Sequence, residues 1–268
     1  MEFQTVVDLP QTDLRIAPFD RMLFVGSCFA QRMGQRFAEE KFPVAVNPDG
    51  VMYNPASVWH ALERYQGPAP KWVVITLGTN RVYIENSTGQ IVDNCQKRPQ
   101  RLFTERSLSV EECADWLTRA VDRVALLNDE AVVVLTVSPI RYRKYGYHGS
   151  QLSKATLLLA ADQVARRYPA RVVYFPAYEL LMDQLRDYRF YAADMIHPSE
   201  QAVEFIWQQF GQAFFSDETR RFLADWQPVK EALAHRPFHP ESQEHRDFQA
   251  VLQAKIALLK EKYPRLEI

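Results

Sequence analysis

The chain has 268 residues, of which 47% are hydrophobic and 24% are charged, and its formal net charge is −1. This length allows one large α/β domain, or a smaller domain with an extension. A net charge so close to zero gives no electrostatic reason to expect nucleic acid or a membrane surface as a partner. The three cysteines have no CxxC spacing, which argues against a disulfide framework and a zinc site, so we expect no metal and no other cofactor.

The N-terminal residues lack the basic region of a signal peptide. No apolar run reaches the length that a bilayer requires. We therefore expect a cytoplasmic protein.

Short β-branched runs alternate with amphipathic stretches in the first part of the chain. Strands are predicted at 22–25, 71–77, 131–137 and 171–175, with a weaker candidate at 42–46. The runs at 71–77 and 131–137 are apolar on both faces, as parallel strands are when helices cover both sides of a sheet.

The stretches between these strands carry helix signals. A helix is predicted after Ser150, with Leu152, Ala155 and Leu159 forming its apolar stripe. Residues 81–94 break the alternation and predict a small inserted hairpin.

The strand signal stops near residue 216. Residues 1–216 are expected to form the α/β domain, and residues 217–268 are expected to form a charged helical extension packed on it. This extension either packs only on its own domain or also makes a homo-oligomer contact.

The most informative motif is the pentapeptide Gly26-Ser27-Cys28-Phe29-Ala30, which follows an apolar strand and runs into a helical stretch. A glycine permits a sharp turn from strand to helix. A serine at such a turn projects beyond the sheet, beside the backbone N–H groups of a helix start.

Further polar residues follow strands at the same predicted edge of the sheet. Gly50 lies in a turn-rich loop, Asn80 follows the strand at 71–77, and Asp194 and His197 share an Asp-x-x-His spacing. In open α/β sheets the ligand crevice lies outside the carboxyl ends of the strands. We therefore expect these residues to meet at one site.

The order Ser27, Gly50, Asn80, His197 resembles the four blocks of the SGNH (GDSL-like) hydrolase superfamily, and the pentapeptide is similar to the string that names its GSCFA branch. The resemblance covers roughly residues 20–215 and includes Asn47–Pro55, Ser138-Pro139, Ser153-Lys154-Ala155 and Asp194–Pro198. It implies a three-layer, flavodoxin-like parallel sheet of about five strands with helices on both faces, followed by the helical extension. It also implies that Ser27 is the nucleophile.

In this interpretation Ser27 attacks an acyl carbonyl, His197 takes and returns the proton, and Asp194 orients the imidazole. The backbone N–H groups of Ser27 and Gly50 and the side-chain amide of Asn80 would form the oxyanion hole. The predicted activity is that of a serine esterase acting on a small-molecule or carbohydrate ester, such as an O-acetyl group. Two alternatives stay open: an O-acyltransferase using the same acyl-enzyme, and a carbohydrate-binding module without catalysis.

Two further features leave alternatives open. Cys28 is a competing nucleophile, because a thiolate is intrinsically stronger and a helix N-terminus lowers its pKa. Its apolar neighbours in the pentapeptide favour an inward-packed side chain instead.

The basic, aromatic residues 141–149 form either a substrate-binding loop, with Arg141 and His148 as contacts, or a solvated loop whose tyrosines pack on neighbours.

Overall fold

The computed structural model describes residues 3–268. Its main sheet has five parallel strands in the order β2-β1-β3-β7-β8. The strands are β1 (Met22–Gly26), β2 (Val44–Val46), β3 (Trp72–Leu77), β7 (Val132–Val137) and β8 (Val172–Tyr174). This is the flavodoxin-like order, in which the chain reverses direction across the sheet between β1 and β3. The predicted fold class is confirmed.

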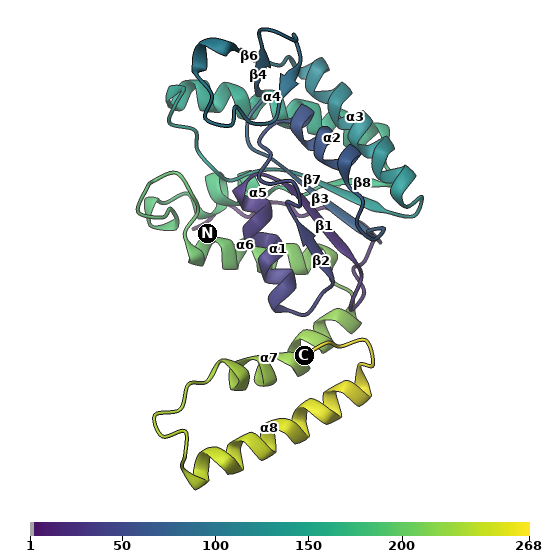
Figure 1. The fold of residues 1–268 in the computed structure, drawn as a ribbon, viewed down its shortest axis with the longest axis vertical. Helices are drawn as coiled ribbons and strands as arrows, with labels where there is room; N and C mark the ends of the chain where they lie inside the picture. The colour runs from purple at the N-terminus through teal and green to yellow at the C-terminus, as the bar shows by residue number, and fades with distance from the viewer. Residues whose placement is uncertain (1–2) are drawn as a thin grey trace.

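Helices cover both faces of this sheet (Figure 1). One face carries α1 (Cys28–Glu39) and α6 (Glu200–Phe214), and the other carries α2 (Pro55–Arg64), α3 (Val110–Leu127) and α4 (Gly146–Arg167). Each layer buries its own apolar core against the sheet. The strands β1, β3 and β7 are buried along their whole length, which explains why their sequences are apolar on both faces.

The chain after β8 is irregular. It forms α5 (Ala177–Glu179), a π-helical turn (Leu180–Leu185) and a 3-10 turn (Tyr188–Phe190) before it reaches α6. An isolated antiparallel bridge between Tyr191 and Pro198 then closes a tight turn. This turn carries Asp194 and His197.

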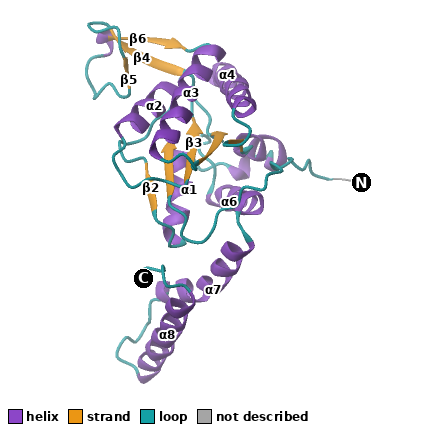
Figure 2. Cartoon of the chain, turned by 90° about the vertical axis from the view of Figure 1, so that its right-hand side faces the viewer, coloured by secondary structure: helices purple, strands orange, loops and turns teal. Residues whose placement is uncertain are grey.

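A second, antiparallel sheet lies apart from the first (Figure 2). It contains β4 (Arg81–Glu85), β5 (Ile91–Val92) and β6 (Phe103–Ser107), with a 3-10 turn (Gln100–Leu102) before β6. The predicted hairpin is confirmed as the β4–β5 pair. The third strand was not predicted, because only Phe103 of its five residues is buried and the others carry no apolar alternation.

The stripe predicted for the helix after Ser150 is wrong. Leu152 and Leu159 are 58% and 56% exposed, whereas Ser153 and Lys154 are buried. This helix is rich in leucine, so more than one stripe satisfies the helical period. The face turned toward the sheet includes two polar side chains because it borders the functional edge of the sheet.

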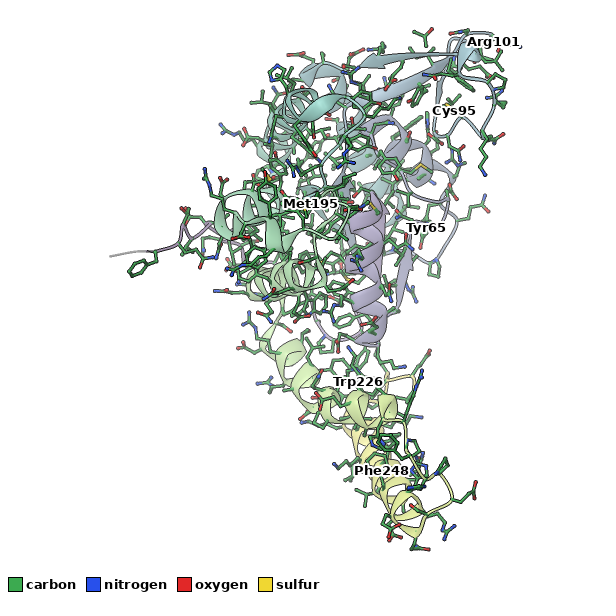
Figure 3. All side chains as sticks on the ribbon, turned by 90° about the vertical axis from the view of Figure 1, so that its left-hand side faces the viewer. Tyr65, Cys95, Arg101, Met195, Trp226 and Phe248 are labelled. Atoms are coloured by element: carbon green, nitrogen blue, oxygen red, sulfur yellow. The ribbon has the colours of Figure 1, made fainter. Side chains whose placement is uncertain are left out.

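The last two helices, α7 (Asp217–Ala234) and α8 (Gln243–Lys262), form a hairpin that projects from the α/β body (Figure 1). Trp226 anchors it: the indole is 1% exposed and its Nε1–H donates to the Glu39 carbonyl over 3.2 Å. Figure 3 places Trp226 where the hairpin joins the body and Phe248 farther out. Within residues 3–268, no helix combines the length and apolar character needed to cross a bilayer.

Candidate active site

The site begins at the sharp turn after β1. Gly26 has a φ of +141°, and a Cβ there would lie 2.2 Å from the Thr76 carbonyl oxygen, so only glycine fits. Its N–H donates to Oδ1 of Asn47 over 2.9 Å. The turn therefore brings the end of β1 against the end of β3, and the side chain of Asn47 holds it there.

Ser27 is fully buried and acts as the N-cap of α1. Its Oγ accepts the N–H of Phe29 over 3.1 Å. The same oxygen lies 2.6 Å from Oγ of Ser138 and 3.0 Å from Oγ1 of Thr76. Three partners satisfy this hydroxyl, so it faces the interior and stabilises the helix start.

Cys28, the first residue of α1, faces the opposite way. Its Sγ lies 3.2 Å from Nε2 of His197. Both residues line a pocket of about 230 Å³, together with Phe29, Arg32, Ile140 and Pro198. The contact that the sequence analysis assigned to Ser27 is thus made by Cys28. This correction has a geometric reason: the N-cap side chain folds back onto the helix, whereas the next residue projects outward.

Asp194 orients the imidazole of His197. Its Oδ2 lies 2.6 Å from Nδ1 of His197, and its Oδ1 accepts the backbone N–H groups of Ile196 and His197 over 2.8 and 3.0 Å. The hydrogen bonds from the backbone and side chain of His197, followed by that from Ile196, hold the pKa of Asp194 well below its usual range. An Nδ1–H bonded to the carboxylate leaves Nε2 free to accept the thiol proton.

Two opposing effects act on the Cys28 thiol. Burial raises its pKa above the usual value, while its own backbone N–H and the charges of Lys154 and Arg32 act in the opposite direction. Burial is the largest of these effects, so the resting thiol is protonated. A base such as His197 is therefore needed to activate it.

The three expected oxyanion donors are engaged elsewhere. The backbone N–H of Ser27 donates to the Thr76 carbonyl over 3.0 Å, and that of Gly50 donates to the Asn47 carbonyl over 2.8 Å. The Asn80 amide donates from Nδ2 to the Leu108 carbonyl over 2.7 Å.

Neither Gly50 nor Asn80 is brought to the Cys28–His197 pair. Gly50 lines a separate pocket with His60 and Arg64. Asn80 is buried, and its backbone N–H bonds Ser153. Both residues shape loops after strands, and the expectation that they assemble with Ser27 into an oxyanion hole is corrected.

Arg141 lies against the turn that carries His197. Its backbone N–H donates to the Ile196 carbonyl over 3.0 Å, and its Nη1 donates to the Met195 carbonyl over 3.3 Å. The guanidinium lies over the rings of Tyr147 and Tyr191, 4.2 and 5.1 Å from their centroids. Arg141 also lines a second pocket of about 210 Å³, together with Leu181, Met182, Arg186, Asp187, Tyr188 and Tyr191.

Two other residues of the 141–149 segment, Lys144 and Tyr145, are anchored on β6. Lys144 Nζ lies 2.9 Å from a carboxylate oxygen of Glu105 on β6, and the Tyr145 hydroxyl donates to the same carboxylate. His148 is exposed in the first turn of α4. The structure therefore places Arg141, but not His148, beside the 194–197 turn.

A model of the GSCFA family matches residues 21–70 and 66–210, which is well over half of the chain. The chain belongs to the GSCFA family. A second model, described as the C-terminal domain of GSCFA domain proteins, matches residues 226–268. Most of the projecting hairpin of this GSCFA protein therefore falls within the residues that the second model matches.

The GSCFA protein is similar to several solved structures. A protein described as a GDSL-like lipase from Parabacteroides merdae matches with a TM-score of 0.50 at 12% identity, covering 76% of this chain and 98% of that chain. The acetylxylan esterase Axe2 from Geobacillus stearothermophilus matches with a TM-score of 0.49 at 14% identity, covering 76% of this chain and 98% of that chain. A carbohydrate esterase family 3 protein from Talaromyces cellulolyticus matches with a TM-score of 0.45 at 12% identity, covering 77% of this chain and 99% of that chain.

No curated protein matches the chain. The family model shows the family of this chain, and the likeness to the GDSL-like lipase shows its fold.

Sequence reasoning assigned no role to the buried residues beneath the site, although Ser138 and Lys154 lie in segments that carry the family resemblance. Thr76 and Ser138 hold the Ser27 hydroxyl, and Lys154 donates from Nζ to the carbonyl oxygens of Gly78 and Ser138, both over 2.8 Å. A lysine on the buried face of this helix was the available signal, because lysine is almost never fully buried without a specific partner.

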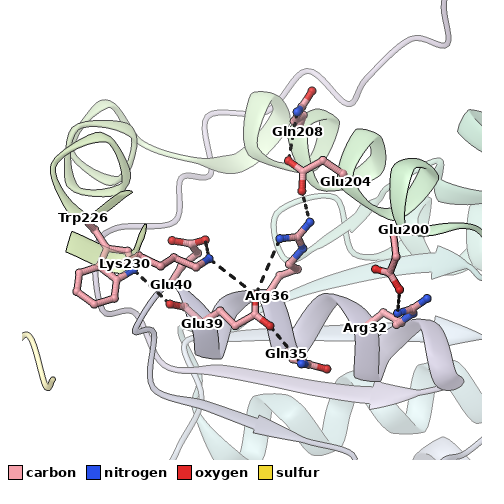
Figure 4. A network of polar contacts seen from close by, with 10 residues as sticks. All are labelled: Arg32, Gln35, Arg36, Glu39, Glu40, Glu200, Glu204, Gln208, Trp226 and Lys230. Atoms are coloured by element: carbon pink, nitrogen blue, oxygen red, sulfur yellow. Dashed lines mark hydrogen bonds and ion pairs between the residues drawn. The ribbon is translucent and has the colours of Figure 1, made fainter. Parts of the chain in front are cut away.

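A polar network on the surface connects the two helices that carry the site (Figure 4). Arg32 and Arg36 of α1 pair with Glu200 and Glu204 of α6. Helix α1 starts at Cys28, and α6 starts three residues after His197. Each exposed pair contributes little by itself. Together they align the helix carrying the sulfur with the segment carrying the imidazole.

Proposed function

We propose that this GSCFA protein is a cysteine-dependent acyl hydrolase that cleaves a small acyl ester through an acyl-Cys28 intermediate. The observation that carries the proposal is the contact of 3.2 Å between Sγ of Cys28 and Nε2 of His197. The contact of 2.6 Å between Nδ1 of His197 and Asp194 completes a nucleophile, a base and an orienting carboxylate.

The reaction proceeds in two halves. Nε2 of His197 takes the thiol proton as the Cys28 sulfur attacks the acyl carbonyl, and the imidazolium then returns that proton to the departing alkoxide. In the second half His197 takes a proton from water, the hydroxide attacks the thioester, and the acid and the free thiol are released. Asp194 stabilises the imidazolium in both halves.

The start of α1 supplies the oxyanion donor in this proposal. The backbone N–H of Cys28 is at the first helical position and lies close to its own sulfur, where its partial positive charge acts on the thiolate. Helix N-termini carry unpaired N–H groups and a positive dipole end, both of which stabilise developing negative charge.

The pockets guide the choice of substrate. The pocket at Cys28, about 230 Å³, suits a small acyl group. The pocket at Arg141, about 210 Å³, is lined by two arginines and two tyrosines together with Asp187. Such a lining suits a polyol or anionic leaving group, so acetylated carbohydrates are the first substrates to test.

The test compares single variants with p-nitrophenyl acetate. We expect Cys28→Ala and His197→Ala each to lower turnover by about three orders of magnitude or more. Mass spectrometry of quenched wild-type enzyme should find the acetyl group on Cys28. Cys95→Ala, which removes another partly exposed thiol, is the matched control. Full turnover in Cys28→Ala would overturn the proposal.

A second candidate is an acyltransferase that uses the same acyl-Cys28. The presence of a second pocket, lined by Arg141, favours it, because a donor and an acceptor require separate sites. Product analysis with and without sugar acceptors separates transfer from hydrolysis. A non-catalytic carbohydrate-binding module does not require the Cys28–His197–Asp194 arrangement.

A further inference from the structure

Lys154 is the most deeply buried charged side chain near the site. It is 1% exposed and lies on the inner face of α4. Its Nζ donates to the carbonyl oxygens of Gly78 and Ser138, each over 2.8 Å. Gly78 follows β3 and Ser138 follows β7, so one ammonium group connects the carboxyl ends of two adjacent central strands.

Hydrogen bonds connect Lys154, through Ser138, to the first turn of the helix that carries Cys28. The ammonium binds the carbonyl of Ser138, whose hydroxyl lies 2.6 Å from the Ser27 hydroxyl. Ser27 caps α1 through the N–H of Phe29, which fixes the first turn of the helix. Removal of Lys154 would therefore loosen the support under Cys28.

Among residues 3–268, no carboxylate pairs with the charge of Lys154. No ion pair within residues 3–268 includes Lys154, and its other neighbour is the ring of Tyr178, with Nζ 5.7 Å from the centroid. A buried ammonium without a counter-ion is costly. Burial lowers the pKa of Lys154 to about 7, and a Cys28 thiolate would raise it again. Ammonium and thiolate therefore favour each other.

We propose that Lys154 is a positioning residue that joins the ends of β3 and β7 beneath the site and provides the buried positive charge against which the Cys28 thiolate forms. This role rests on the proposed function of Cys28. It explains why a helix facing an apolar sheet carries a lysine at this position. It also explains how a largely buried thiol gives up its proton to His197.

Other groups also act on the thiol. His197 contacts it from the 194–198 turn, and the Arg32 charge acts on it from α1. Tyr53 and Tyr142 interact electrostatically with the thiolate from two neighbouring loops. The experiment must separate the buried Lys154 charge from the exposed Arg32 charge.

The experiment measures the rate at which iodoacetamide alkylates Cys28 as a function of pH. A Cys95→Ser background leaves the fully buried Cys113 as the only other thiol. We expect Lys154→Met to slow alkylation about tenfold at pH 6, below the pKa of about 7 of Lys154, because loss of a nearby opposite charge raises a thiol pKa by about one unit or more. Lys154→Arg should restore most of the rate.

Lys71→Met is the matched control, because Lys71 is a partly exposed lysine that precedes β3 and pairs with Glu130 at 2.8 Å. It should leave the alkylation profile unchanged. An unchanged profile in folded Lys154→Met would overturn the role of Lys154. The alkylation assay does not depend on turnover, so it remains informative even if Cys28 is not the nucleophile.

A measurement on the Cys95→Ser protein with Lys154 intact covers the case in which Lys154→Met fails to fold. Salt screens exposed charges strongly and buried charges weakly, so the alkylation midpoint should stay constant between about 0.05 and 1 M NaCl. A midpoint that rises with salt would assign the effect to Arg32, whose side chain is 39% exposed, and would overturn the proposal.

Discussion

The sulfur of Cys28 lies 3.2 Å from Nε2 of His197, whereas the hydroxyl of the preceding residue, Ser27, lies 2.6 Å from the hydroxyl of Ser138. Two adjacent nucleophilic side chains therefore point in opposite directions from one turn. The serine supports the helix start, and the cysteine contacts the imidazole. Single substitutions can therefore test whether Ser27 contributes to stability while Cys28 contributes to the proposed reaction.

We expect Ser27→Ala to affect stability and Cys28→Ala to affect turnover. Loss of the Ser27 hydroxyl removes an N-cap and leaves buried hydroxyl groups of Thr76 and Ser138 short of a partner. The cost should be about 1–3 kcal/mol of unfolding free energy. Urea unfolding and ester turnover at low temperature measure the two effects. Loss of turnover in a folded Ser27→Ala protein would argue for Ser27 as the nucleophile.

Asp194 should make stability depend on acid pH. Its folded pKa is depressed below the ordinary value of 3.8, so its contribution is fully present above that value and is lost as pH falls toward the folded pKa. The difference in unfolding free energy between wild type and Asp194→Asn should therefore shrink as pH falls from 6 to 3, a range set by the ordinary carboxyl value. A constant or growing difference would contradict this origin.

Met195 should tolerate glycine but not a β-branched residue. It has a φ of +59°, in the left-handed region, and this conformation lets Asp194 bond the N–H groups of Ile196 and His197. Met195→Gly should keep kcat/KM within about threefold, since glycine adopts this conformation without strain. Met195→Val should lower it by about tenfold or more, because strain misplaces the imidazole. Equal activity in both variants would show that the conformation is not needed.

Arg141→Ala should raise KM more than it lowers kcat. The guanidinium lines the pocket of about 210 Å³ but is not in contact with Cys28 or the imidazole of His197, so its loss removes binding rather than chemistry. Steady-state kinetics with an acetylated sugar and with p-nitrophenyl acetate check this, and the sugar should show the larger KM change. Arg143→Ala, at an exposed position nearby, is the control.

Trp226→Ala should destabilise the α/β body although Trp226 belongs to the projecting hairpin. The indole is 1% exposed, and its truncation should cost about 3–5 kcal/mol. Leu258→Ala on α8, where the side chain is 66% exposed, should change stability by less than about 0.5 kcal/mol. Thermal unfolding of both variants provides the comparison. Equal melting temperatures would mean that the hairpin is not coupled to the body.

Much of the fold was predictable because strand burial leaves a strong periodic signal. The apolar runs at β1, β3 and β7 are buried on both faces, and the residues after them define one edge of the sheet. The β6 strand and the buried face of α4 were not predictable in the same way. Which residues of β6 and α4 are buried depends on tertiary neighbours that are distant in the sequence, so the local pattern of apolar residues does not reveal it.

The sequence by itself determined the order of strands along the chain, the tight turn at Gly26 and the Asp-x-x-His segment, because these depend on local sterics and hydrophobic periodicity. Only the tertiary structure decided which side chain of the turn meets His197. That choice depends on the direction of the first turn of α1 and on three buried hydroxyl groups contributed by β1, β3 and β7 ends. The tertiary structure also brings Lys154 beneath the site, where it donates to the carbonyl of Gly78, a residue more than seventy positions away along the chain.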